Sequence, residues 1–294
     1  MHSLAITDHG AMYGVIPFYQ ACRAAGIKPI IGVETYVAPR SHTSKEAKVD
    51  ANPYHMILLA RDQVGYRNLM ALVSRAHLDG YYYKPRIDKE LLAEHSAGLI
   101  GTSGCLSGEV LRRLGEGDEK GAAQAADDYR SILGDGNFFI EIQDHGLTDQ
   151  SRLQPQLIEL AGKLSIPLLA TNDTHYTFPE QHAAHDLLLC IQTNSNLDTP
   201  GRMRFDTNEF FLKSPAEMRR LFNGELPEAM DNTLRVAETV DLQLDFANLR
   251  LPHFPVPDGE TSSTWLRREC ERGLSLRYGD RLTDGVHGRL DYEL

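Results

Sequence analysis

The chain has 294 residues, of which 41% are hydrophobic and 24% charged, and its 30 Lys and Arg against 41 Asp and Glu give a net charge of −11. This composition is typical of a globular protein that can bury a core without disulfides. No apolar run approaches the ~18–20 residues of a membrane span. The acidity argues against a simple electrostatic clamp on nucleic acid, although not against nucleic acid handled through bound cations.

The cysteines and the start of the chain indicate a cytoplasmic protein. Cys22, Cys105, Cys190 and Cys270 form no CxxC pair, which fits reduced thiols better than a disulfide framework. The first residues carry neither the basic region nor the apolar stretch of a secretory signal peptide. We therefore expect a cytoplasmic chain without a membrane anchor.

Short apolar strands alternate with amphipathic helices through the first two thirds of the chain. The predicted strands are residues 4–7, 29–37, 99–101, 138–142 and 167–170, and the segment 54–60 is also apolar. The helices predicted between them are residues 15–25, a helix capped by Asp62, a helix begun by Asp118, and a helix striped by leucines over 153–164. This alternation predicts mainly parallel pairing and an α/β layer or barrel.

After about residue 178 the pattern becomes mainly helical. Helices are predicted at residues 180–191, 215–222, 227–240 and 264–278, with a polar loop at 192–204. Residues 251–259 hold three prolines and a glycine, which favour a connector because proline lacks the amide donor that a helix requires.

Side chains that bind metals gather near the ends of the predicted strands. They are Asp8 and His9 after the first strand, Glu34 within the second, Cys105 after the strand 99–101, and Asp173 and His175 after the strand 167–170. In an α/β barrel these strand ends converge on one mouth. In an extended chain Asp173 and His175 point the same way, and a carboxylate with an imidazole suits Zn²⁺, Mn²⁺ or Fe.

His55 differs because it begins its segment instead of ending one. If the chain leaves the mouth after residue 37 and returns through the 38–54 loop, His55 still reaches that mouth. We therefore predict that His55 lies next to Glu34.

Structural roles remain open for each of these residues on spacing alone. Asp8 can cap the following helix, and Cys105 can serve as a small buried hydrophobe. His145 can cap a loop or support a metal ligand, whereas His182 and His185 fit a structural pair on one helix face. Taken together, the ligand-type side chains at several strand ends weaken a purely structural interpretation, but their spacing alone leaves both a metal site and structural roles open.

Several longer stretches resemble one protein family. They are residues 5–14 (AITDHGAMYG), 26–34 (GIKPIIGVE), 81–88 (YYYKPRID), 102–108 (TSGCLSG), 171–176 (TNDTHY), 185–192 (HDLLLCIQ), 203–205 (MRF) and 209–215 (EFFLKSP). Together they resemble the N-terminal PHP (polymerase and histidinol phosphatase) domain of bacterial DNA polymerase III alpha subunits. The resemblance covers nearly the whole chain.

The resemblance implies a distorted α/β fold, a TIM-like (βα)7 barrel, that holds two or three divalent cations (Zn, Mn, Fe or Mg). The implied metal ligands are His9, Glu34, His55, Cys105, Asp173 and His175. Asp8 and His145 would then hold ligands in place from outside the coordination sphere. The implied chemistry is phosphoester hydrolysis, which some members retain as a 3′–5′ exonuclease, whereas others keep the domain as a platform for a separate proofreading exonuclease.

The sequence departs from this family at its start. In the family, a strand with a His-x-His motif and a further ligand precede the Thr-Asp-His-Gly motif, which here begins at Thr7. We therefore expect a barrel without its first strand and helix, an incomplete metal site and an unpaired sheet edge.

Four segments are expected: the PHP barrel core at residues 1–178, the helical remainder of that domain at 179–250, a proline-rich linker at 251–261 and the start of a polymerase domain at 262–294. The implied partners are DNA, reached through the full-length polymerase, and other replisome subunits.

Two alternative functions stay open. One is a docking module without hydrolytic activity. The other is a stand-alone histidinol-phosphatase-like enzyme. Residues 82–87 and 212–215 argue against it because they match the polymerase branch.

Overall fold

A computed structural model describes residues 1–222, 224, 226–248 and 252–294. It contains two compact units, Met1–Gln243 and Leu244–Leu294. Residues 249–251, which include the first residue of the predicted linker, lie outside the described residues. None of the helices in the described ranges combines the length and the hydropathy needed to cross a bilayer.

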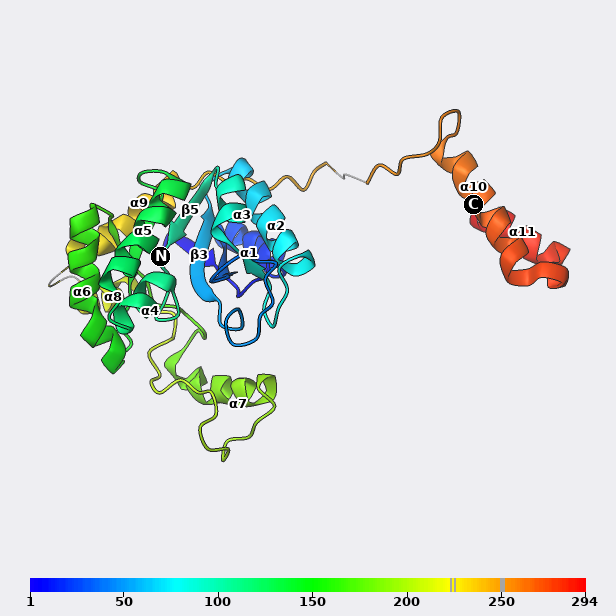
Figure 1. The fold of residues 1–294 in the computed structure, drawn as a ribbon. Helices are drawn as coiled ribbons and strands as arrows, with labels where there is room; N and C mark the ends of the chain where they lie inside the picture. The colour runs from blue at the N-terminus through cyan, green and yellow to red at the C-terminus, as the bar shows by residue number, and fades with distance from the viewer. Residues whose placement is uncertain (223, 225, 249–251) are drawn as a thin grey trace. The chain divides into compact units, whose positions relative to one another are not determined.

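The larger unit is built on one curled sheet (Figure 1). Its strands are β1 Ser3–Ile6, β2 Lys28–Val37, β3 Tyr54–Ala60, β4 Arg86–Ile87, β5 Leu99–Thr102, β6 Phe138–Ile142 and β7 Leu168–Ala170. The strand order is β1-β2-β3-β5-β6-β7, and β4 pairs with β2 beside this path. The expected mixed α/β class is therefore confirmed as a curled sheet with helices.

The prediction of mainly parallel pairing is right except at β3. β3 runs antiparallel to both β2 and β5, whereas the β1–β2, β2–β4, β5–β6 and β6–β7 pairs are parallel. The segment between β2 and β3 contains no crossover helix, so the chain turns back beside β2 instead of crossing over. This reversal brings the first residues of β3 next to the last residues of β2.

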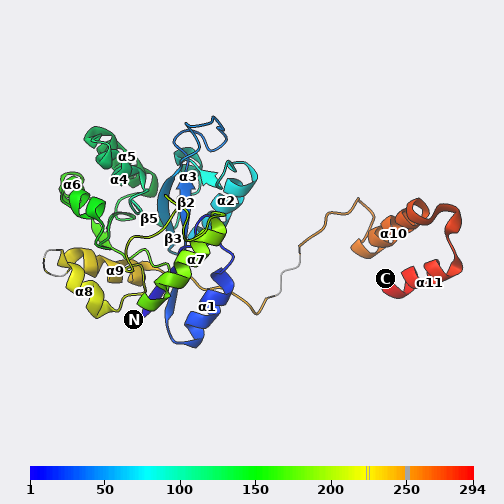
Figure 2. The same cartoon turned by 90° about the horizontal axis from the view of Figure 1, so that it is seen from below.

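Helices surround the strands of this unit (Figure 2). They are α1 Val15–Ala24, α2 Gln63–Leu78, α3 Lys89–Glu94, α4 Glu109–Gly115, α5 Glu119–Leu133, α6 Thr148–Leu164, α7 His182–Gln192, α8 Pro215–Phe222 and α9 Pro227–Thr239. α3, α4 and the two-residue β4 were not predicted, because such short elements leave little periodic signal. The helix predicted at 180–191 is a 3-10 turn, Pro179–Gln181, followed by α7.

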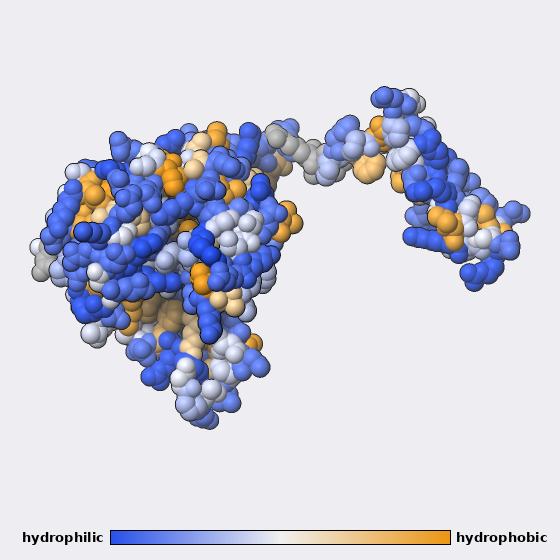
Figure 3. Space-filling view, viewed as in Figure 1, coloured by the Kyte–Doolittle hydropathy of each residue, from blue (hydrophilic) through white to orange (hydrophobic). Residues whose placement is uncertain are grey.

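The hydrophobic core is formed mainly by strands that are buried on both faces. β6 is buried throughout, and every residue of β2 after Lys28 is buried. The helices add one apolar stripe each, such as Leu153, Leu157 and Leu160 of α6. The outer surface seen in Figure 3 is mainly hydrophilic, with scattered hydrophobic patches.

A buried arginine fixes the long loop between β2 and β3. The fully buried guanidinium of Arg86 donates hydrogen bonds to the backbone carbonyls of Gly80, Asp50, His42 and Ser44. One side chain thus satisfies several carbonyls that the loop cannot pair internally. The loop is held in place, and β3 begins at a defined position.

The smaller unit contains the helices α10 Ser262–Tyr278 and α11 Asp284–Glu293, joined by a 3-10 turn, Gly279–Arg281. Thr261 caps α10 by accepting a hydrogen bond from the amide of Thr264. An Arg267–Asp291 ion pair of 2.7 Å links the two helices. α10 begins within two residues of its predicted start, and α11 was not predicted.

Candidate metal centre

His9, Glu34 and His55 form a compact group of ligand atoms. Glu34 Oε1 lies 2.7 Å from His55 Nδ1, and Glu34 Oε2 lies 3.5 Å from His9 Nδ1. One ligand atom from each residue lies within 4.8 Å of the others. The predicted closeness of His55 and Glu34 is confirmed.

The register of the sheet explains this grouping. His9 forms a parallel bridge with Glu34 just beyond β1. In the antiparallel β2–β3 pair, Tyr36 faces His55 and Glu34 faces Ile57. Glu34 and His55 are therefore diagonal neighbours on the same face of the sheet, which is within reach of their side chains.

The protonation states suit metal binding. Burial by itself raises the pKa of Glu34, but the hydrogen bond from His55 and the nearby imidazoles outweigh it, so its pKa lies below the usual value. Burial lowers the pKa of His9, and the charge of Glu34 opposes this only in part. The group therefore offers an ionised carboxylate and a neutral imidazole, which are the forms that bind cations.

Cys105 completes this side of the site. Its Sγ lies 3.6 Å from His55 Nδ1 and 3.8 Å from Glu34 Oε1. It follows Gly104, whose φ of +73° lets the chain turn sharply after β5. Burial, followed by the negative charges of Glu34 and Asp173, raises the pKa of the Cys105 thiol. The thiol is therefore protonated unless a cation displaces the proton.

Asp173 and His175, which follow β7, line the same cavity as His9 and Glu34. The ring centroids of His9 and His175 are 6.2 Å apart, and Asp173 Oδ1 lies 3.7 Å from His175 Nδ1. Burial and the charge of Glu34 raise the pKa of Asp173 to about 7. The two side chains are close, but the predicted extended backbone is wrong, because Asp173 has a left-handed φ of +43°.

Asp8 and His145 take different positions. Asp8 is exposed and lines the opening, and it does not cap α1, whose N-cap is Gly14 without a side-chain hydrogen bond. His145 is fully buried, with Nε2 2.8 Å from the carbonyl of Asn172 and Nδ1 2.8 Å from Gln150 Nε2. His145 therefore supports the loop that carries Asp173.

The helix histidines lie beside the site without joining the His9–Glu34–His55 group. The ring of His185 meets the edge of His175 at 5.5 Å, and its Nδ1 has no hydrogen-bond partner among the described residues. His182 contacts Tyr176. Cys22 and Cys190 are buried on α1 and α7, as expected of core residues.

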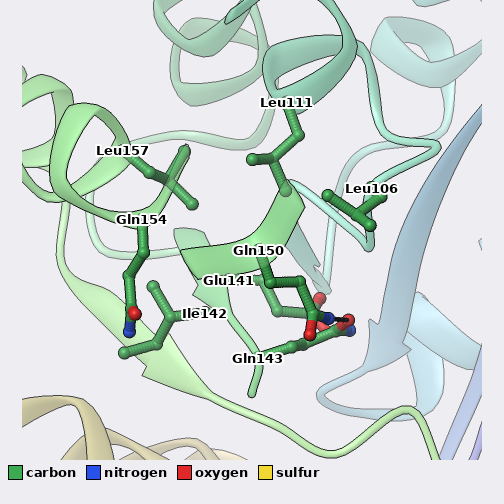
Figure 4. Close-up of a pocket in the computed structure, with 8 residues that line it drawn as sticks. All are labelled: Leu106, Leu111, Glu141, Ile142, Gln143, Gln150, Gln154 and Leu157. Atoms are coloured by element: carbon green, nitrogen blue, oxygen red, sulfur yellow. Dashed lines mark hydrogen bonds between the residues drawn. The ribbon is translucent and has the colours of Figure 1, made fainter. Parts of the chain in front are cut away.

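Glu141 is a site residue that the sequence reasoning missed. It is buried in β6 and accepts hydrogen bonds from Thr102, Thr171 and, at 2.8 Å, Gln143. Figure 4 shows its carboxylate beside the amides of Gln143 and Gln150, opposite the leucines of a small cavity. Burial raises its pKa. A glutamate within the apolar run of residues 138–142 was the signal that could have identified it.

A cavity of about 540 Å³ lies between β1 and β7 and reaches the metal-type ligands. Its lining includes Leu4, Ile6, Asp8, His9, Glu34, Cys105, Glu141, Leu169, Thr171, Asp173 and His175. A neighbouring cavity of about 280 Å³ is lined in part by Met203, Arg204, Phe205 and Phe210, from the loop after α7. Phe205 contacts the edge of His175 with ring centroids 4.7 Å apart. This loop therefore forms one wall of the access to the site.

Comparison with known proteins shows which families this chain is similar to. Residues 1–145 match the family model of the PHP domain. A solved structure described as a metal-dependent phosphoesterase from Bifidobacterium adolescentis aligns with 59% of this chain and 77% of its own, at 14% identity and a TM-score of 0.34.

The whole chain is similar to DNA polymerase III alpha subunits. It is 44% identical to that of Treponema pallidum over 99% of this chain and 25% of the relative, and 43% identical to that of Thermus aquaticus over 97% and 24%. The chain spans about a quarter of the length of these relatives. The resemblance predicted from the motifs is confirmed.

Proposed function

We propose that this chain provides a metal-dependent phosphoesterase site, of the 3′–5′ exonuclease type, within a DNA polymerase III alpha subunit. The observation that carries the proposal is the His9–Glu34–His55 group, whose ligand atoms lie within 4.8 Å of one another inside the PHP-matched residues. The similarity to polymerase subunits supports a nucleic acid as the phosphoester.

The donor set fits divalent cations. Two imidazoles, a carboxylate and a nearby thiol suit Zn, Mn or Fe better than Mg, which prefers oxygen ligands. We assign His9, Glu34, His55 and Cys105 to one cation, and Asp173 with His175 to a second. A third cation would need ligands beyond these six residues. We therefore propose two or three cations for an intact domain.

Each side chain has a defined task in this proposal. Bound divalent cations supply Lewis-acid polarisation of a phosphoryl oxygen and a water of lowered pKa. His9 and His55 present ring nitrogens that Glu34 orients through its hydrogen bond and charge. Cys105 and Asp173 give up protons when they become ligands. Asp8 lines the opening, and His145 holds the loop that carries Asp173.

We further propose that the sheet is an incomplete (βα)7 barrel and that the metal site is incomplete with it. Within the described residues β1 pairs only with β2 and β7 only with β6, and the 540 Å³ cavity lies between these two edges. A barrel that is open between β1 and β7 and lacks part of its ligand set should bind metal more weakly than a complete one. Stoichiometric, tightly held metal together with rapid turnover would contradict this part of the proposal.

The wider context is also a proposal. We assign residues 1–178 to the barrel core, 179–250 to its helical remainder, 251–261 to a linker and 262–294 to the start of a polymerase domain. The parent protein would then synthesise DNA in the bacterial cytoplasm, reaching DNA through its other domains and contacting other replisome subunits.

Hydrolysis assays test the site directly. The purified chain is loaded separately with Zn²⁺, Mn²⁺, Fe²⁺ or Mg²⁺, and release of nucleotides from a 3′-labelled oligonucleotide and of nitrophenol from bis(p-nitrophenyl) phosphate is measured. We expect slow hydrolysis that Glu34→Gln abolishes, because this substitution removes the ionised carboxylate. Absence of hydrolysis with every metal, or activity equal in Glu34→Gln, would overturn the proposed activity.

A docking module is a second candidate, favoured by one observation. Leu187, Leu188 and Ile191 of α7 are 50%, 62% and 77% exposed, which is unusual for three large apolar residues on one short helix. The partner proposed for this role is a proofreading exonuclease. If the role is correct, Leu188→Asp with Ile191→Asp should abolish binding of that exonuclease while leaving metal binding unchanged.

A further inference from the structure

Three exposed tyrosines and one lysine lie on the loop that follows His9 and on the loop before β4 that packs against it, and they have no role in the proposed chemistry. They are Tyr13, Tyr81, Tyr83 and Lys84, which we call the aromatic rim. The tyrosine side chains are 84%, 53% and 68% exposed, and Lys84 is also exposed. Large exposed aromatic residues gathered near a site indicate contact with a ligand.

The fold builds this rim from two loops that are far apart in the sequence. A Cβ atom on Gly10 would lie only 2.7 Å from Cγ of Pro85, so the loop after β1 packs directly on the loop before β4. His77 Nε2, from α2, lies 2.9 Å from the carbonyl of Gly10 and ties α2 to the same place. The buried Arg86, next in sequence to Pro85, anchors the second loop.

The tight turn at residues 82–84 presents the side chains outward. The amide of Tyr82 donates to the carbonyl of Lys84 at 3.0 Å, and Tyr83 has a left-handed φ of +59°. The rings of Tyr82 and Tyr83 meet edge to face at 4.6 Å. Because the turn is anchored at both ends, the aromatic faces are held before any ligand arrives, which reduces the entropy lost on binding.

Lys84 connects the rim to the metal-type ligands. Its Nζ lies 5.4 Å from the ring centroid of Tyr36, and the Tyr36 ring stacks on His9 at 5.8 Å. Among the described residues no carboxylate lies within ion-pair distance of this ammonium, in contrast to Lys89, Lys163 and Lys213. An unneutralised cation beside a phosphoesterase-type site is suited to a phosphate group.

We propose that the aromatic rim binds single-stranded nucleic acid next to the scissile phosphate, with Lys84 on a backbone phosphate and the tyrosines stacked on bases. The proposal rests on the proposed function and names the residues that position its substrate. Single strands are bound by this combination of cation and aromatic faces, and their unpaired bases leave ring faces open for stacking. The chain's net charge of −11 gives no general attraction for DNA. Binding of a nucleic acid therefore requires a local group of side chains that contacts it.

Binding without metal tests the rim separately from hydrolysis. Fluorescence anisotropy of fluorescein-labelled dT12 is measured with the full 294-residue chain in EDTA, between 25 and 200 mM salt. Lys84→Ala should weaken binding and reduce the slope of log K against log salt by ~0.7, the value for one phosphate contact on a single strand. Lys120→Ala is the matched control, since Lys120 is an exposed lysine on α5, outside the rim, and the slope should not change.

The tyrosines are tested by a conservative pair. Tyr81→Ala should weaken dT12 binding at least about fivefold, because stacking contributes ~1–3 kcal/mol per base, whereas Tyr81→Phe keeps the ring and should bind like the unmodified chain. A parallel measurement with rU12 distinguishes RNA from DNA as the ligand. Binding of either oligonucleotide supports a single-stranded nucleic acid. A fully paired 12-mer should bind more weakly.

Other results overturn the proposal. These are absence of dT12 binding, equal binding by Lys84→Ala and Lys120→Ala, equal binding by both Tyr81 variants, or displacement of dT12 by poly-glutamate at matched charge. The last result would indicate an acidic protein segment as the ligand. Because dT12 binding is measured in EDTA, absence of hydrolysis by the unmodified chain with every metal contradicts the proposed function and leaves the rim intact.

Discussion

His55 Nδ1 lies 2.7 Å from Glu34 Oε1 because β3 runs antiparallel to β2. In a uniformly parallel sheet the first residue of a strand lies at the opposite edge from the end of its neighbour. The reversal of one strand therefore lets a residue at the start of β3 join residues at the ends of β1 and β2. The candidate metal centre depends on this single change of direction.

Removal of one ligand from the group should abolish most metal binding. His55→Ala is expected to weaken Zn²⁺ binding by more than the ~10–100-fold that loss of an outer partner of a ligand typically causes. The control is His287→Ala, because His287 is exposed on α11, outside the unit that holds the ligands. Competition with a chromophoric chelator measures both affinities, and equal affinities would contradict the assignment of His55.

Metal affinity should rise with pH between 6 and 8. Burial raises the pKa of Asp173 to about 7 and also raises the pKa of Cys105, so both groups hold protons at pH 6 that a cation must displace. Each proton released changes the affinity by up to about tenfold per pH unit. Chelator competition at pH 6, 7 and 8 checks this, and an affinity independent of pH would show that neither group becomes a ligand.

Gly65 should not tolerate a methyl group. A Cβ atom there would lie 1.9 Å from the carbonyl oxygen of Gly98, so Gly65→Ala must separate α2 from the turn before β5. We expect a loss of about 2–3 kcal/mol in the free energy of unfolding. Gly162→Ala on α6 is the matched control, since nothing lies within 4 Å of its added Cβ, and it should gain about 0.5–1 kcal/mol. Urea unfolding measures both, and equal effects would contradict the packing described.

Asp62 should stabilise α2 in a pH-dependent way. Its carboxylate accepts hydrogen bonds from the amides of Val64 and Gly65, both at 2.9 Å, and the Gly65 bond is the main cause of its lowered pKa. Asp62→Ala should lose ~1 kcal/mol at pH 7, whereas Asp62→Asn keeps an acceptor and should lose less.

The sign of this pH effect follows from the lowered pKa. The contribution of the charge is complete above the pKa of an unfolded aspartate, ~3.9, and disappears as the pH falls through the lower folded value. The difference between Asp62 and Asp62→Asn should therefore shrink below about pH 4 and vanish at lower pH. Urea titrations at pH 7, 4 and 3 check this, and a difference that grows toward low pH would contradict it.

The sequence predicted most long elements because their signals are local. The cap at Asp62, the stripe of leucines in α6 and the apolar strand β6 all appear within one window of the chain. The same reasoning missed α3 and α4, since very short helices have no clear period. It expected mainly parallel strands and considered the reversal at β3 only as the condition for His55 to reach Glu34, because strand direction is set by partners distant in sequence.

The sequence by itself determined the residue types of the site, their association with strand ends and the likeness to a known family. Apart from the closeness of His55 to Glu34, only the tertiary structure decided which of them meet. It joined His9, Glu34 and His55 through an antiparallel strand, and it brought Asp173 to His175 through a left-handed backbone. It also placed Lys84 over the ring of Tyr36, which stacks on His9. These contacts depend on strand register and loop packing, which arise from interactions across the whole fold and leave no mark in any local stretch of sequence.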